Sequence, residues 1–234
     1  MKSQSVKPAG NRILFILIFV ILGFIALQIP VNTLAGSRVK FTLFDLFVPV
    51  SGAFLGTGLG IVSVLAMQIS HLIFHGFSGV EGTSGLKFLA TLRFIPTVFG
   101  VWFFAKREGR LLIVPAISII AFNLHPIGRG VWFYSLFWLI PFLVWPFRDR
   151  FLVLRALGAT MTAHAVGGAI WIWAFNMPAA VWISLIPVVI MERSIFALGI
   201  SASYILMNNI LGHLSLKRLL PSGISFDKKY ILKF

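Results

Sequence analysis

Long apolar runs, separated by short basic clusters, constrain this chain more than any other feature of its sequence. Several of these runs reach the roughly 20 residues that an α-helix needs to cross a bilayer. Hydrophobic residues make up 59% of the chain and charged residues 11%, against about 25% charged residues in soluble domains. A soluble domain could not bury this much apolar surface. We therefore expect an all-α fold, a polytopic transmembrane helical bundle with about six to eight membrane segments.

The basic clusters predict how this bundle is oriented. The formal net charge is +14, but Lys and Arg lie between the apolar runs and do not form one basic stretch, so we expect no nucleic-acid partner. Cytoplasmic loops of membrane proteins are rich in Lys and Arg, which also attract anionic membrane lipid. The strongest internal cluster contains Lys106, Arg107 and Arg110. Placing it inside predicts a multi-pass protein of the cell (inner or plasma) membrane, with both termini cytoplasmic.

The chain is expected to form a single membrane domain with a basic tail at each end. Residues 1–12 form the first cytoplasmic tail, residues 13–213 the membrane domain, and residues 214–234 the second tail. The first apolar run, 13–29, resembles a signal peptide, and residues 33–36 resemble a cleavage site. Because the run is longer than the usual signal-peptide core, we interpret it as an uncleaved first span.

A glycine-rich apolar stretch, residues 41–75, is too long for one span. A hinge around Gly56 is expected to divide it into two short spans or a re-entrant hairpin. Gly52, Gly56 and Gly60 recur at every fourth residue and on one helix would form a strip without side chains. Such a strip lets a second helix approach to backbone contact in lipid. It predicts a face for partner docking, with packing inside the chain as the alternative.

Two polar stripes at helical spacing are candidate cavity walls. Gln68, His71 and His75 form the first, and the two histidines have the spacing of paired metal ligands. Five histidines and no cysteine are too few for a membrane di-iron enzyme, so we expect no metal. The second stripe combines a hydroxyl, an imidazole, a gap and an indole. It contains Thr160, His164, Gly167 and Trp171, and is either a ligand-binding face or a helix–helix seam.

Glu192 is the only acidic residue in the last long apolar segment, residues 179–213. A lone carboxylate at membrane depth needs a cation, a proton or a ligand. Arg193 is expected to be a poor partner, because neighbours in a helix point about 100° apart. The segment is too long for one span, and we expect Pro187 and the pair Glu192–Arg193 to divide it.

A candidate ligand site is expected near the outer face of the membrane, where the last two long apolar segments have their outer ends. The outer ends of the last two long segments supply a titratable ring, two indoles, an amide and a carboxylate, which suit an aromatic or cationic metabolite. These residues are His164, Trp171, Trp173, Asn176 and Glu192. Most other tryptophans lie near predicted span ends and are interpreted as an interfacial belt. No P-loop, Gly-x-Ser-x-Gly motif or cysteine is present, so we expect no catalytic residue, no cofactor and no ATP-driven pumping by this chain alone.

The run from Phe44 to Gly56, FDLFVPVSGAFLG, followed by Gly60, is similar to early membrane segments of the substrate-binding S components of energy-coupling-factor vitamin transporters. The resemblance implies a six-span fold that captures a vitamin-sized substrate near its outer face. It also implies docking through small residues four apart, here Gly52, Gly56 and Gly60, on a transmembrane coupling subunit that carries two ATPase subunits. The alternative function is a structural or assembly subunit of a membrane complex without transport activity.

Overall fold

The helices of the structure largely follow the apolar runs of the sequence. The structure is a computed structural model that describes residues 12–33, 40–75, 91–92 and 94–232. Its α-helices are α1 (Arg12–Leu27), α2 (Leu43–Phe47), α3 (Ser51–Leu55), α4 (Thr57–His75), α6 (Phe94–Ala105), α7 (Ile113–Leu124), α8 (Pro126–Gly130), α9 (Ile140–Val144), α10 (Leu152–Phe175) and α11 (Ala179–Leu216). Within the described residues the fold is helical apart from one short ribbon, which confirms the all-α part of the expected fold class. In that ribbon β1 (Pro30–Thr33) pairs antiparallel with β2 (Lys40–Thr42).

Short 3₁₀ helices extend or connect several of the α-helices. They are η1 (Val48–Val50), η2 (Gly109–Leu112), η3 (Trp132–Leu139), η4 (Trp145–Phe147) and η5 (Lys228–Tyr230). The apolar run 131–147 is therefore irregular along most of its length, with α9 as its one α-helical part. Pro141 and Pro146 each remove a backbone N–H in this run, which interrupts regular α-helical hydrogen bonding.

Helix α10 lies at the centre of the fold and packs against α6, α7, α9 and α11. Small buried residues on α10 allow this close packing. A Cβ added at Gly158 would lie 2.5 Å from the Phe103 ring of α6, and one at Gly168 would overlap the ring of Trp138. Aromatic rings from two sides therefore lie directly against the α10 backbone.

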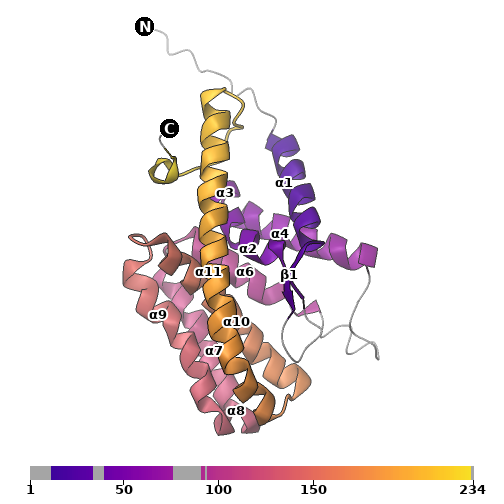
Figure 1. The fold of residues 1–234 in the computed structure, drawn as a ribbon, viewed down its shortest axis with the longest axis vertical. Coiled ribbons are helices and arrows are strands. Elements are labelled where there is room, and N and C mark those ends of the chain that lie inside the picture. Colours follow the sequence, from indigo (N-terminus) through magenta and orange to yellow (C-terminus); the bar gives the residue numbers. More distant parts are fainter. Residues whose placement is uncertain (1–11, 34–39, 76–90, 93, 233–234) are drawn as a thin grey trace.

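Helix α11 is one continuous helix of 38 residues, roughly 57 Å long at 1.5 Å per residue. The predicted division at Pro187 and Glu192–Arg193 is therefore wrong. Trp182 and Val189 are both buried, so packing holds the helical turns on either side of the proline despite its missing hydrogen bond. Figure 1 shows α11 running along the molecule, with one half beside α10 and the other nearer α1 and the C-terminal end.

The glycine-rich stretch contains the expected hinge, which lies at Gly56. Helix α3 ends at Leu55, Gly56 has φ of 84°, and α4 begins at the next residue. Glycine is favoured here because a left-handed backbone strains residues that carry a Cβ. In Figure 1, α4 runs across the direction of α11.

The three glycines do not form one strip, so the expectation of a continuous docking face on one helix is wrong in its geometry. The hinge at Gly56 places Gly52 and Gly60 on different helices, where they face each other. A Cβ at Gly60 would lie 2.5 Å from the Gly52 Cα, and one at Gly52 would lie 2.8 Å from Val101 of α6. These two glycines serve internal packing, whereas Gly56 is exposed and a Cβ there would meet nothing within 4 Å.

The outer surface of several helices is apolar. On α7 the exposed residues Ile113, Ile117, Ile120 and Leu124 recur at helical spacing, and Leu124 is 66% exposed. Helices α1 and α11 show similar outward-facing Ile and Leu residues. By length and composition, residues Thr57–Phe74 of α4 and the whole of α11 could cross a membrane. Several other apolar helices, including α1, α6 and the η2–α7 run, are shorter.

Candidate functional site

A buried polar cluster lies between α10 and α11. Glu192 and Arg193 are 2% and 8% exposed, and Thr160 of α10 is 4% exposed. The Arg193 Nη2 lies 3.6 Å from the Glu192 Oε2, and Nη1 donates a hydrogen bond to the Thr160 hydroxyl at 3.1 Å. The guanidinium also lies 4.6 Å from the centre of the Phe196 ring. Arg193 thus links its own helix to α10.

The expectation that Arg193 is a poor partner for Glu192 is wrong. Adjacent residues leave a helix in different directions, but both side chains are long enough to bend toward the same buried region. Burial adds the driving force, because an unpaired charge away from water is far more costly than a paired one. The structure therefore supplies an ion-pair partner that residue spacing did not indicate.

Asp45 brings a second carboxylate to this region from α2. Its Oδ2 accepts hydrogen bonds from the Thr42 backbone N–H at 2.8 Å and from the Thr42 hydroxyl at 3.3 Å, which together form a capping box at the start of α2. Asp45 also interacts electrostatically with Arg193. Helix α2 packs closely on α11, where a Cβ at Gly199 would lie 2.8 Å from Leu46. The cluster therefore combines one guanidinium with two carboxylates.

One oxygen of this cluster has no donor among the residues that the structure describes. The Glu192 Oε1 is buried and accepts no hydrogen bond from any of them. A buried acceptor without a donor costs about 1–3 kcal/mol, and more when it is charged. Glu192 is therefore the candidate residue whose position calls for a further donor.

His164 is held on both sides by a different set of partners. The Trp138 indole donates a hydrogen bond to the His164 Nδ1 at 3.0 Å, and the Tyr134 Oη lies 3.2 Å from the His164 Nε2. An indole N–H can only donate, so Nδ1 carries a lone pair and the neutral ring bears its proton on Nε2. That N–H then donates to the Tyr134 oxygen. Both ring nitrogens of His164 are therefore used within the protein.

The residues of the second polar stripe on α10 contact several different elements of the fold. Thr160 contacts α11 through Arg193, His164 contacts η3, and a Cβ at Gly167 would lie 3.6 Å from Pro96 of α6. Trp171 is half-buried and packs on Phe175, with ring centres 5.4 Å apart. This arrangement matches the helix–helix seam that the sequence left open as an alternative.

We expect His164→Leu to lower the free energy of unfolding by about 1–3 kcal/mol, because it leaves the buried Trp138 N–H and Tyr134 hydroxyl without their partner. Thermal unfolding of the purified protein in detergent measures this effect. His213→Leu is the matched control, because His213 is exposed near the end of α11. An equal and small effect of both substitutions would show that the network does not stabilise the fold.

Trp138 and Trp182 are buried core residues, at 0% and 2% exposed, so for them the interpretation as an interfacial belt is wrong. Both rings pack edge-on against Phe122, with ring centres 5.0 and 4.9 Å away. Tyr134 packs edge-on against Trp182 at 4.9 Å. Tyr134 was not singled out from the sequence, because η3 is a 3₁₀ helix and its spacing of four residues from Trp138 does not align the two side chains there.

The structure places the remaining predicted site residues at the far end of α10. Trp173 is 56% exposed, and its indole donates to the Ala121 carbonyl at 2.9 Å. Asn176 is exposed and ends α10 with φ of 47°, a left-handed conformation that asparagine adopts more readily than most residues. The structure thus does not bring Trp173 and Asn176 to the buried cluster around Glu192.

The first polar stripe lies on α4, partly against α1. Gln68 is 7% exposed, and its side-chain amide nitrogen has no hydrogen-bond partner among the described residues. The His71 ring is half-buried and lies 6.3 Å from the Phe24 ring of α1. Nothing in these contacts connects the stripe with Glu192.

Basic residues from three distant segments meet in one place, which we call the basic junction: Lys106, Arg107, Arg148, Arg150, Arg155 and Lys229. Arg107 pairs with Asp149 at 2.8 Å, and the Lys229 ammonium donates to the Asp149 carbonyl at 3.4 Å. Arg148 donates to the Lys106 and Phe103 carbonyls. Burial lowers the pKa of Arg148 to about 10, so it is still charged at neutral pH.

The geometry stands without support from known proteins. The chain matches no family model, no curated protein and no solved structure.

Proposed function

We propose that the chain is a multi-pass protein of a prokaryotic inner membrane, with the basic junction on the cytoplasmic side. Three observations support this placement. Exposed apolar residues follow α1, α7 and α11, two helices are long and apolar enough to cross a bilayer, and basic segments far apart in sequence converge. Such convergence is what the excess of Lys and Arg in cytoplasmic loops produces when a bundle folds.

Labelling of single cysteines in intact cells or oriented vesicles tests this topology, and the native chain contains no cysteine. We expect Arg107→Cys and Arg150→Cys to react only from the cytoplasmic side, and Pro126→Cys and Pro178→Cys only from the outside. Pro126 is a better position than Gly128, where a Cβ would overlap the Phe122 carbonyl. Labelling of position 107 from the outside alone would overturn this orientation. Gly79 is also expected on the outside, but it lies outside the described residues.

We further propose that this bundle binds a small solute at the cluster of Asp45, Thr160, Glu192 and Arg193. The observation that carries this proposal is the buried Glu192 Oε1, which has no donor among the described residues. A solute that donates an N–H or carries a positive charge would complete the hydrogen bonding of this carboxyl group.

Within a membrane, such a site suits the substrate-capturing subunit of an importer. On this proposal the chain takes a vitamin-sized metabolite from the outside and docks on a separate transmembrane coupling subunit with two ATPase subunits. The resemblance of residues 44–60 supports this step. Because Gly52 and Gly60 already contact each other, docking would use the open side of the hinge at Gly56 and Gly58.

A structural or assembly subunit of a membrane complex is the competing proposal. The close packing of Gly52, Gly60 and Val101 favours this proposal, because it gives the chain a rigid scaffold. The two functions differ in what the intact protein retains on purification. A binding subunit retains a small molecule, whereas a structural subunit retains a fixed protein partner and no metabolite, and mass spectrometry of the purified protein distinguishes them.

A further inference from the structure

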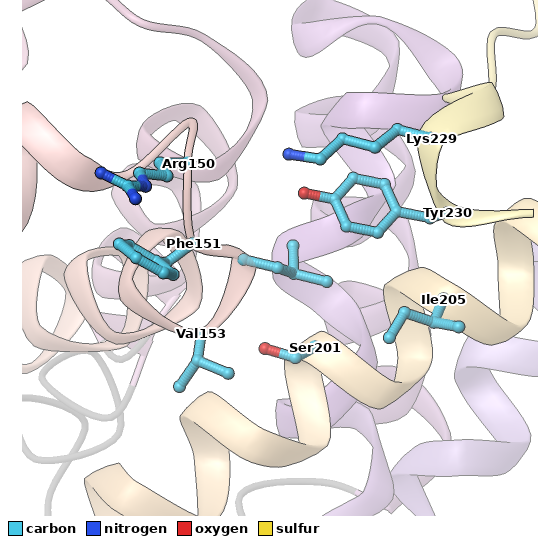
Figure 2. A pocket seen from close by; sticks show the side chains of 8 residues that line it. Arg150, Phe151, Val153, Ser201, Ile205, Lys229 and Tyr230 are labelled. Carbon is cyan, nitrogen blue, oxygen red and sulfur yellow. The ribbon is translucent and has the colours of Figure 1, made fainter.

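A second site lies beside the basic junction. A pocket of about 280 Å³ opens between the start of α10, the middle of α11 and the C-terminal segment. Its lining consists of Arg150, Phe151, Leu152, Val153, Ser201, Ile205, Lys229 and Tyr230. Figure 2 shows Arg150 and Lys229 at one end of the pocket, with Val153, Ser201 and Ile205 toward the other. The pocket therefore has a cationic end and a mainly apolar remainder.

The wall formed by the C-terminal segment is fixed in place by side chains of α11. The Asn209 amide donates to the Tyr230 carbonyl at 3.0 Å, and its Oδ1 accepts from the Leu232 backbone N–H at 2.8 Å. The Asn208 Oδ1 accepts from the Asp227 backbone N–H at 2.5 Å. These bonds hold η5 against α11 and position Lys229 and Tyr230 as a wall of the pocket.

The positive charges of Arg150 and Lys229, at the cationic end, are not neutralised by any residue that lines the pocket. No acidic residue is among its lining residues, and the nearby Asp149 carboxylate is paired with Arg107. The Lys229 ammonium donates to the Asp149 carbonyl and lies 5.3 Å from the centre of the Tyr230 ring. The Arg150 guanidinium lies 5.1 Å from the centre of the Phe151 ring. Two cations therefore lie at one end of the pocket, without a carboxylate partner among its lining residues and beside aromatic and aliphatic side chains.

We propose that this pocket binds an anionic membrane phospholipid. Its phosphate would lie between Arg150 and Lys229, and the first part of an acyl chain would lie against Phe151, Val153 and Ile205. Basic pockets between helices on the cytoplasmic side bind anionic lipid headgroups in this manner. The volume of about 280 Å³ is below the roughly 300–1,000 Å³ of small-molecule sites, which fits part of a lipid. This inference rests on the membrane placement proposed above.

Photo-crosslinking tests the proposal. The full chain is reconstituted into phosphatidylcholine vesicles that contain a photoreactive phosphatidylglycerol or, separately, the matching photoreactive phosphatidylcholine. Crosslinked peptides are identified by mass spectrometry. We expect the phosphatidylglycerol probe to label the segments 150–153 and 229–230 roughly tenfold more than the phosphatidylcholine probe.

Variants assign this selectivity to the two cations. Arg150→Gln with Lys229→Gln is expected to abolish the preference for phosphatidylglycerol. Lys217→Gln with Arg218→Gln removes the same charge from exposed residues outside the pocket lining and is expected to preserve it. Loss of the preference in both double variants would overturn the proposal, because net charge alone would then explain it.

The remaining outcomes separate this inference from the membrane placement. Equal labelling by both probes would show a bilayer contact without anion selectivity, so the lipid site would be wrong while the placement stands. Labelling of the chain by neither probe would contradict both. Displacement of the phosphatidylglycerol probe by inorganic phosphate would identify a site for a soluble anion and overturn the assignment to lipid.

Discussion

Glu192→Gln is expected to weaken solute binding tenfold or more, about 1.4 kcal/mol, while the protein still inserts and folds. The carboxylate lies 2% exposed beside Arg193, and its Oε1 is the acceptor available to a solute N–H or cation. The amide removes the charge but keeps an acceptor and nearly the same volume. Arg193 still donates a hydrogen bond to the Thr160 hydroxyl, so the link between α10 and α11 is kept. Titration of the purified variant with the co-purified metabolite measures the change.

A double variant distinguishes a direct contact from an effect through Arg193. Removing one partner of a buried ion pair costs about 3–5 kcal/mol, much of it from the charge left behind. If Glu192 acts only as the partner of Arg193, Glu192→Gln with Arg193→Gln restores neutrality of the pair and should recover the affinity. If Glu192 contacts the solute, the double variant binds as weakly as Glu192→Gln or more weakly. Unchanged affinity in Glu192→Gln would place the site elsewhere.

Gly60→Leu is expected to prevent folding of the α3–α4 corner. A Cβ at Gly60 would lie 2.5 and 2.6 Å from the Cα and N of Gly52, and these backbone atoms cannot rotate away as a side chain does. Overpacking of a close core contact costs about 1–3 kcal/mol for a few added methylenes, and a leucine against the backbone should exceed this range. Size-exclusion chromatography and thermal unfolding in detergent measure the loss.

Gly58→Leu is the matched control for this prediction. It makes the same change two residues earlier on α4, where a Cβ would meet nothing within 4 Å. We expect it to fold normally, because leucine also has a higher helix propensity than glycine. A Gly60→Leu protein that folds normally but fails to bind its partner would instead support the continuous docking strip that the sequence suggested.

The helix positions could be predicted because they follow local composition. The run 13–29 largely coincides with α1 (Arg12–Leu27), and the hinge at Gly56 lies where glycines cluster. The continuity of α11 could not be predicted in this way. Pro187 is a strong local signal for a break, but the packing of Trp182 and Val189 against the bundle overrides it.

The site was only partly predictable, because its partners are distant in sequence. Glu192 could be found as a lone acidic residue in an apolar segment. The hydrogen bond from its partner Arg193 to Thr160, 33 residues away, depends on how α10 and α11 pack, and no local pattern predicts that packing. The Tyr134 contact with His164 spans 30 residues and was missed for the same reason.

The glycine strip shows how one wrong local assumption changes a functional conclusion. The spacing of Gly52, Gly56 and Gly60 makes one face only if the helix is continuous. The positive φ of Gly56 ends α3, so the outer two glycines meet within the chain. The spacing correctly marked a place of close backbone approach, but the approaching helix is α4 of the same molecule.

Mass spectrometry of the intact protein, purified in mild detergent without added metabolites, tests the central claim most directly. We expect the wild-type chain to retain one small molecule with an N–H donor or a positive charge, and Glu192→Gln to lose it under the same conditions. His213→Leu, altered at an exposed position, should retain it. Wild-type protein that carries a fixed protein partner and no metabolite, or a metabolite kept equally by Glu192→Gln, would contradict solute binding at this cluster.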